Sequence, residues 1–191
     1  MDIKRRIVLV EDLRKFKTKR NLEQAFIKLL KTKDFAKITI GDICKVAFTS
    51  RSTFYLHYLD KFDLLEKVFN KQVEDFELIV KKRLKSLMTL NWKMSIEQFY
   101  AELIAHKESI LVLFQINVPQ YNLQNEFKRV IESYLRAYFT QHELSLEVDV
   151  DLATQIAAGV IFEILNWTFE HGIDNRALKF AEKMRVVLIE D

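Results

Sequence analysis

Apolar residues near the start of the chain recur at the spacing of an α-helix. Five of them fall at positions i, i+3, i+4, i+7 and i+8, which places them in one stripe along a helix surface. Thr18 precedes the stripe, and its hydroxyl can accept a hydrogen bond from a free N–H group of the first turn. The pattern predicts an amphipathic helix over residues 18–33 that begins at Thr18. The residues of the stripe are Leu22, Ala25, Phe26, Leu29 and Leu30.

Two short helices are expected next. Thr39 and Asp42 occupy the N-cap and N3 positions of a capping box, which predicts a helix that begins directly after Thr39. The run FTS at residues 48–50 breaks the apolar period, and Ser50 can cap a third helix. Two short helices joined by a tight turn after a longer helix are typical of a helix-turn-helix unit.

The third helix, expected over residues 51–58, has two different faces. Phe54 and Tyr58 are four residues apart and therefore point the same way, toward the two earlier helices. Arg51 and Tyr55 lie elsewhere on the cylinder. The apolar pair predicts how the helix is anchored, and the polar residues are available to a partner.

The rest of the chain predicts longer helices. Only three glycines and one proline occur in 191 residues, far fewer than the turns of a barrel, a sandwich or an α/β sheet need. We expect an all-α protein with a helix-turn-helix domain over residues 15–62 and a helical domain over residues 63–191. The longer helices expected are 61–87 capped by Asp60, 96–116 capped by Ser95, 125–141, 149–170 closed by Gly172, and 175–190.

Composition argues against several classes of function. The glycines are isolated from one another, so they form neither a phosphate-binding loop nor a dinucleotide fingerprint. A single cysteine, Cys44, excludes an intramolecular disulfide and suits a reducing cytosol. The apolar run near the N-terminus is too short for a signal peptide, and no long uninterrupted apolar window predicts a membrane span. We expect a soluble cytoplasmic protein with no membrane partner.

Charge is divided unevenly along the chain. Residues 1–67 contain 16 basic and 9 acidic residues, whereas residues 68–191 contain 14 and 18. A basic first third on an acidic remainder is expected where one end of a protein meets a polyanion such as nucleic acid. A basic face that meets only solvent gives the same pattern, so charge alone leaves both interpretations open.

One run of sequence combines several motifs in a fixed order. In FAKITIGDICKVAFTSRSTFYLHYLDKFDLLEKVF, T-x-x-D-I opens the second helix, A-x-x-S marks the turn, T-F-Y-x-H-Y lies in the third helix and D-K-x-x-L-L opens the fourth. With this order and spacing, residues 18–69 resemble the tetracycline-repressor (TetR) family of transcriptional regulators. The segment FYLHYLDK is similar to a subgroup of dihydroxyacetone-kinase-type regulators.

The resemblance implies that the third helix enters the DNA major groove. It places Tyr55 and His57 on phosphates, with Lys61 as a further phosphate contact and Thr39 as a donor to phosphate. Arg51 has the planar guanidinium that can read a guanine edge. Without the resemblance, Tyr55 and His57 would be surface residues of a small bundle. The expected DNA contacts are Thr39, Ser50, Arg51, Ser52, Thr53, Tyr55, His57 and Lys61.

The sequence departs from the family pattern at two positions. Phe48 stands in the turn where members of the family usually have glycine, and a positive φ there would cost phenylalanine roughly 1–2 kcal/mol. Gly41 stands in the second helix where relatives often have a base-reading side chain. We therefore expect specificity to depend more on the third helix.

The C-terminal domain is rich in aromatic residues at helical spacing. Most of them are expected in the core, and some could line a pocket between helices for an unknown small-molecule effector, as the resemblance implies. The candidates for the pocket are Trp92, Phe99, Phe114, Tyr134, Phe162 and Trp167.

Neither a metal site, nor a cofactor, nor an enzyme activity is expected. His106, His142 and His171 are widely spaced and lack partners at metal-ligand spacing. They also lack a neighbouring nucleophile. Cys44 is interpreted as a small core residue, with a redox-sensing thiol as the alternative.

The helix expected over residues 149–170 combines small and large apolar residues around its circumference. Ala153, Ala157, Ala158 and Gly159 favour close helix packing, and the wide apolar surface indicates burial on two sides. The resemblance implies a homodimer through the last two helices, and a central helix of a monomer is the alternative.

These observations predict a ligand-responsive DNA-binding regulator, acting as a repressor that a small molecule releases from its operator. One alternative is a DNA-binding module controlled by a protein partner. A more distant one is a helical adaptor that binds no DNA. The identity of operator and inducer, and repression as against activation, do not follow from the sequence.

Overall fold

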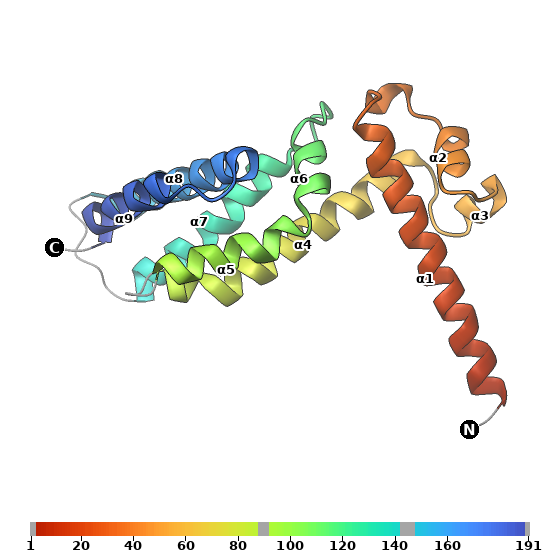
Figure 1. Cartoon of the computed structure of the whole chain (residues 1–191), viewed down its shortest axis with the longest axis horizontal. Coiled ribbons are helices and arrows are strands. Elements are labelled where there is room, and N and C mark those ends of the chain that lie inside the picture. The colour runs from red at the N-terminus through yellow and green to blue at the C-terminus, as the bar shows by residue number, and fades with distance from the viewer. Residues whose placement is uncertain (1–2, 88–91, 142–147, 190–191) are drawn as a thin grey trace. The chain divides into compact units, whose positions relative to one another are not determined.

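A computed structural model describes residues 3–87, 92–141 and 148–189 of the chain. All regular elements in these ranges are helices, as Figure 1 shows, and the all-α expectation is confirmed. The elements are α1 (Ile3–Leu30), the 3₁₀ turn η1 (Phe35–Lys37), α2 (Ile40–Val46), α3 (Arg51–Tyr55), α4 (Lys61–Leu87), α5 (Trp92–Ile104), α6 (Lys107–Phe114), α7 (Leu123–Gln141), α8 (Val150–His171) and α9 (Asn175–Ile189).

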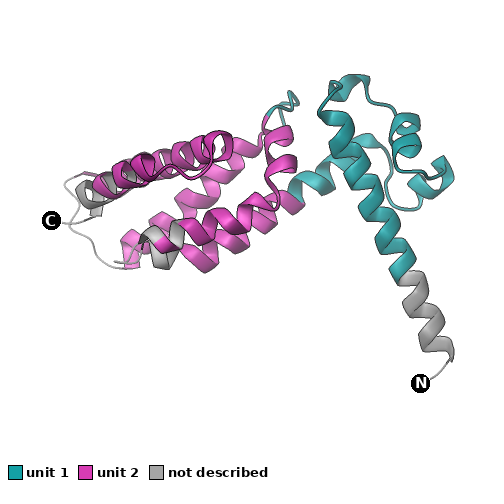
Figure 2. Cartoon of the chain, viewed as in Figure 1, with its two compact units in different colours: residues 1–70, 115–121 teal, residues 71–114, 122–191 magenta. Residues whose placement is uncertain are grey.

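The helices form two compact units, coloured separately in Figure 2. The first, called the head, consists of residues 1–70 and 115–121. The second, called the body, consists of residues 71–114 and 122–191. The division lies within α4, between residues 70 and 71.

The three-helix core of the head is small and apolar. Phe26 of α1, Ile43 of α2 and Phe54 of α3 are fully buried. Tyr58, just after α3, is also buried, and its hydroxyl donates a hydrogen bond to the Glu23 carboxylate of α1 at 3.1 Å. Burying side chains of this size contributes about 1.5–3 kcal/mol each. These anchors hold the five-residue α3, which is too short to be stable alone, and the inward face expected for this helix is confirmed.

The first helix is longer than the sequence pattern indicated. It begins at Ile3, so the expected start at Thr18 is wrong and Thr18 lies inside the helix. Residues 3–17 contain neither glycine nor proline. A helix that is stabilised by the apolar stripe at residues 22–30 can therefore extend toward the N-terminus without meeting a helix breaker. A residue with a good capping side chain does not by itself start a helix.

The single helix expected over residues 96–116 is also wrong. The chain forms α5 and α6 there, with a turn at residues 105–106, and Ser95 lies inside α5. The buried Leu103 and Ile110 are seven residues apart, a spacing that a continuous helix also keeps on one face. The apolar period therefore concealed the break.

In the body, α8 packs against α7 and α9. Ala153, Ala157 and Ala158 are all buried, which lets neighbouring helices approach closely. Asp149 caps α8 by accepting a hydrogen bond from the Asp151 N–H at 2.8 Å. The helix is long and apolar enough to cross a membrane by length and composition, with a mean hydropathy of 1.3. Packing within the body buries 44% of this apolar window.

Candidate nucleic-acid interface

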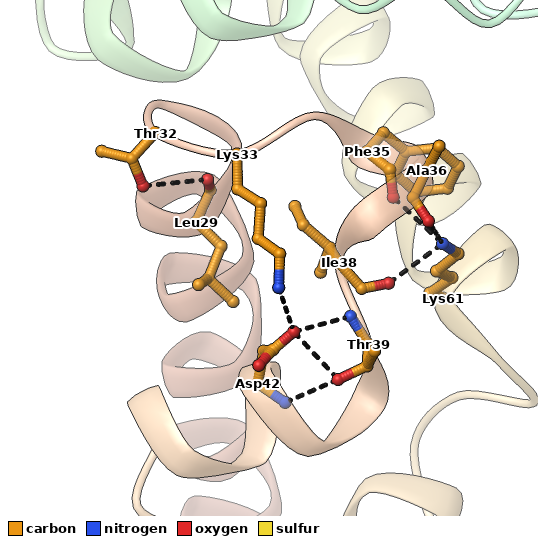
Figure 3. A network of polar contacts seen from close by, with 9 residues as sticks. All are labelled: Leu29, Thr32, Lys33, Phe35, Ala36, Ile38, Thr39, Asp42 and Lys61. Atoms are coloured by element: carbon orange, nitrogen blue, oxygen red, sulfur yellow. Dashed lines mark hydrogen bonds and ion pairs between the residues drawn. The ribbon is translucent and has the colours of Figure 1, made fainter.

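The start of α2 is fixed by a capping box, shown in Figure 3. Thr39 Oγ1 accepts a hydrogen bond from the Asp42 N–H at 3.1 Å, and the Thr39 N–H donates to Asp42 Oδ2 at 3.0 Å. Lys33 Nζ lies 2.7 Å from the same carboxylate oxygen. The hydrogen bond from Lys33, followed by those from Thr39, lowers the pKa of Asp42 to about 2. Thr39 is exposed, but its hydroxyl donates its one hydrogen to Asp42 Oδ2 at 2.9 Å. The predicted donation to a phosphate would therefore require that bond to be exchanged.

Lys61, the first residue of α4, contacts the loop that precedes α2. Its ammonium group donates hydrogen bonds to the carbonyl oxygens of Phe35 (3.0 Å), Ala36 (3.0 Å) and Ile38 (2.9 Å), as Figure 3 shows. It also lies 4.7 Å from the centre of the Phe35 ring. A lysine has three N–H donors, so these bonds use all of them. A phosphate contact by Lys61 would require one of the three to be exchanged.

The first turn of α3 is a cluster of hydroxyl groups. Ser50 caps the helix by accepting a hydrogen bond from the Thr53 N–H at 3.1 Å. Its Oγ also lies 2.8 Å from Ser52 Oγ and 2.8 Å from Thr53 Oγ1. The expected caps of α2 and α3 are therefore both confirmed, and short hydroxyls of this kind suit phosphate oxygens.

Arg51 begins α3 and lies against α2. A Cβ atom placed on Gly41 would be 2.9 Å from Arg51 Nη2 and 3.6 Å from Thr39 Oγ1. The guanidinium group of Arg51 therefore occupies the space beside Gly41 that a side chain there would take. Arg51 itself is exposed.

Tyr55 and His57 lie at the other end of α3. The Tyr55 side chain is 56% exposed, and its ring packs edge-on against Phe54 with 5.6 Å between centroids. His57 is half-buried. Burial lowers the pKa of His57, and the positive charges of Lys19, Lys15 and Lys67 lower it further. The imidazole thus lies among cations of α1 and α4.

The turn between α2 and α3 contains a strained residue. Phe48 has φ = 52°, in the left-handed region, and its side chain is 97% exposed. The turn is closed by a hydrogen bond from the Thr49 N–H to the Cys44 carbonyl oxygen at 3.0 Å. The turn therefore keeps the conformation that favours glycine, without a glycine.

The helical architecture has counterparts among solved structures. A TetR transcriptional regulator from Streptococcus agalactiae is 21% identical, with 96% of this chain and 99% of that chain covered and a TM-score of 0.65. The regulator PfmR from Thermus thermophilus is 17% identical over 90% of this chain and 94% of its own, with a TM-score of 0.56. The dihydroxyacetone kinase operon activator DhaS is 18% identical over 90% and 93%, with a TM-score of 0.54.

The chain has the fold of the TetR-family regulators. No protein-family model and no curated protein sequence matches it. The resemblance drawn from the motifs is thus supported across nearly the whole chain at the level of fold. The likeness to the dihydroxyacetone-kinase-type subgroup stays a prediction.

Within the TetR fold, most of the predicted pocket aromatics of the body pack against other rings. Phe99 and Phe162 are buried, and the half-buried Phe114 contacts Phe162 at 6.0 Å between centroids. Tyr134 is half-buried, with its hydroxyl 3.4 Å from a Glu77 carboxylate oxygen. Trp167 is 47% exposed and stacks on His171, and the side chain of Trp92 lies outside the described residues.

The remaining candidates can be placed as well. Cys44 is buried, and burial raises the pKa of its thiol, so the interpretation as a core residue is confirmed. Among the residues that the structure describes, no group of histidine, cysteine or carboxylate side chains could hold a metal ion. His142 falls outside them.

Sequence reasoning missed two features of this interface. It treated Gly41 only as a lost contact, although the position is filled by Arg51 from the next helix. It also treated Lys61 only as a phosphate contact. Both contacts join residues at least ten positions apart in the sequence. Capping motifs and apolar spacing involve only residues within a few positions, so they cannot predict such contacts.

Proposed function

We propose that the protein is a DNA-binding transcriptional regulator. The observation that carries the proposal is the division of α3 into two faces. Phe54 is fully buried on the inner face, whereas Arg51, Ser52 and Tyr55 are exposed. The TetR fold of the chain and the excess of basic residues over residues 1–67 support the same function.

In this proposal the DNA-facing residues of the head fall into two groups, those that contact phosphates and one that reads a base. Ser50, Ser52 and Thr53 offer hydroxyl groups to phosphate oxygens. Tyr55 offers its phenolic hydroxyl and His57 its imidazole N–H to the same kind of acceptor. Arg51 reads a guanine edge through its two parallel N–H donors. Thr39 contacts phosphate at the start of α2, and Lys61 holds the loop before it.

We further propose that the protein acts as a homodimer through α8 and α9. Leu152, Ile156 and Trp167 of α8 are between 42% and 48% exposed, and Phe180 of α9 is 59% exposed. A dimer would cover this apolar surface. A two-fold axis would also present two α3 helices to successive major grooves, about 34 Å apart.

Control by a small molecule is the finer part of the proposal. The body would bind an apolar effector near the aromatic cluster of Phe99, Phe114, Tyr134 and Phe162, and release of the operator would follow from the effector's differential affinity for two states. DhaS is named as an operon activator. A reporter assay must therefore test whether this protein represses its promoter, as proposed, or activates it. Control by a protein partner is the alternative.

The function is tested by titrating the purified chain against labelled duplexes from its own upstream region. A shuffled duplex of equal composition serves as the control. We expect affinity for one upstream duplex to exceed that for the shuffled one by roughly 10³-fold or more. We also expect a steep loss of affinity between about 50 and 200 mM salt. Equal binding to all duplexes would contradict the proposal.

A further inference from the structure

The guanidinium group of Arg51 in α3 lies beside Gly41 in α2, in the space that a side chain at position 41 would occupy. Arg51 Nη2 and Cζ lie 2.9 Å and 3.8 Å from the position of a Cβ on Gly41, whereas ordinary contacts begin at about 3.4 Å. Any side chain at position 41 would therefore displace the guanidinium. The three nearest atoms to that position are two from the flexible end of Arg51 and the Thr39 hydroxyl oxygen at 3.6 Å, all of them side-chain atoms. The displacement would thus leave the core of the head intact.

The position of this guanidinium matters because Arg51 is the residue proposed to read a base. A bidentate contact to the O6 and N7 atoms of guanine requires a planar fork held in one orientation. Long arginine side chains lose much rotational freedom when they are fixed in this way. A surface that receives the guanidinium before DNA binds reduces that loss. Gly41 supplies such a surface at the first turn of α2.

We infer that Gly41 is a specificity-determining position, which acts by giving the Arg51 guanidinium room to lie against α2 in the orientation that reads guanine. Gly41 touches no base in this account. It is a positioning residue, and its effect on base choice passes through Arg51. The inference rests on the proposed DNA-binding function.

The local surroundings agree with this role. Thr39 and Asp42, on either side of Gly41, are locked together by the capping box and by Lys33. The first turn of α2 is therefore fixed by hydrogen bonds that do not involve position 41. Substitution of Gly41 by alanine would leave that box intact and would favour the helical backbone.

The test compares Gly41→Ala, Arg51→Ala and the double variant with the wild type. Each is titrated against the best upstream duplex and against duplexes that carry all four bases, one position at a time. The position read by Arg51 is the one at which Arg51→Ala relaxes the preference for guanine. We expect Gly41→Ala to reduce the preference at that same position, by roughly fivefold or more, with other positions unchanged. In the Arg51→Ala background, Gly41→Ala should have no further effect.

Thermal unfolding of each variant separates this effect from loss of structure. Gly41→Ala should melt at or above the wild-type temperature. An unchanged base preference in Gly41→Ala, or an effect of equal size without Arg51, would overturn the inference while leaving the DNA-binding function in place. If the wild type prefers no duplex, the proposed function fails and the inference fails with it.

Discussion

The ammonium group of Lys61 donates a hydrogen bond to the carbonyl oxygen of Ile38 at 2.9 Å. Ile38 directly precedes Thr39, the N-cap of α2. Two further bonds, to the carbonyl groups of Phe35 and Ala36, complete the connection. The first residue of α4 thus holds the loop from which the helix-turn-helix begins.

Lys61→Met should destabilise the head. Methionine keeps the apolar stem and removes the three charge-assisted hydrogen bonds, so we expect a loss of about 1.5–3 kcal/mol in the free energy of unfolding. Urea denaturation followed by circular dichroism measures the loss. Lys81→Met, an exposed position further along α4, is the control and should change stability by less than about 0.5 kcal/mol. Equal stability of both variants would argue against the role of Lys61.

The acid sensitivity of the head should depend on Asp42. Its pKa is about 2 in the folded chain against an ordinary value of 3.8, because the carboxylate accepts hydrogen bonds from Lys33 and Thr39. A carboxyl group with a lowered pKa stabilises the fold above its ordinary pKa, and this contribution disappears as the pH falls toward the folded value. The advantage of the wild type over Asp42→Asn should therefore be full above about pH 4 and should shrink toward pH 2. Urea titrations of both proteins at several pH values measure it, and an advantage that stays constant over this range would contradict the prediction.

Phe48→Gly should stabilise the protein. Relief of the left-handed conformation contributes about 1–2 kcal/mol, and the greater freedom of glycine in the unfolded chain offsets about 0.4–1 kcal/mol of this. We expect a net gain of about 0.5–1 kcal/mol in equilibrium unfolding. Phe48→Ala keeps a Cβ atom and hence the strain, and since the ring is 97% exposed it should be close to neutral. A glycine variant no more stable than the alanine variant would show that the turn carries no strain.

The proposed dimer makes Ile156 a sensitive position. Ile156→Lys would bury an unpaired charge in the apolar interface. The free-energy cost of burying that charge should be large enough to dissociate a dimer of ordinary affinity. Sedimentation velocity should report a dimer for the wild type and a monomer for this variant. Leu78→Lys, at an exposed leucine of α4, is the matched control and should remain dimeric. A monomeric wild type would contradict the dimer directly.

The sequence predicted the features of the fold that local rules govern. The caps predicted at Thr39, Ser50 and Asp60 are confirmed, because in each case a side-chain oxygen accepts from an N–H group within three residues. The same local rule failed at Thr18 and Ser95, which lie inside longer helices. The inward face of Phe54 and Tyr58 followed from a four-residue spacing. These determinants are contained within one or two turns of helix, so a single sequence reveals them.

The features that sequence did not predict depend on distant residues or on the absence of a signal. The contact of Arg51 with Gly41 and the bonds of Lys61 to the loop join separate elements. The early start of α1 followed from a lack of helix breakers, which leaves no positive mark in the sequence. Only the three-dimensional arrangement supplies such information.

The most direct measurement of the central claim is the affinity of Arg51→Ala for upstream and shuffled duplexes, beside Arg129→Ala. The second variant removes the same charge from an exposed position on α7 of the body. Arg51→Ala should lose roughly 5- to 150-fold in affinity for the preferred duplex, with a much smaller change for the shuffled one. Arg129→Ala should bind both duplexes as the wild type does. If Arg51→Ala retains wild-type discrimination between the two duplexes, α3 does not read DNA through Arg51 and the account fails.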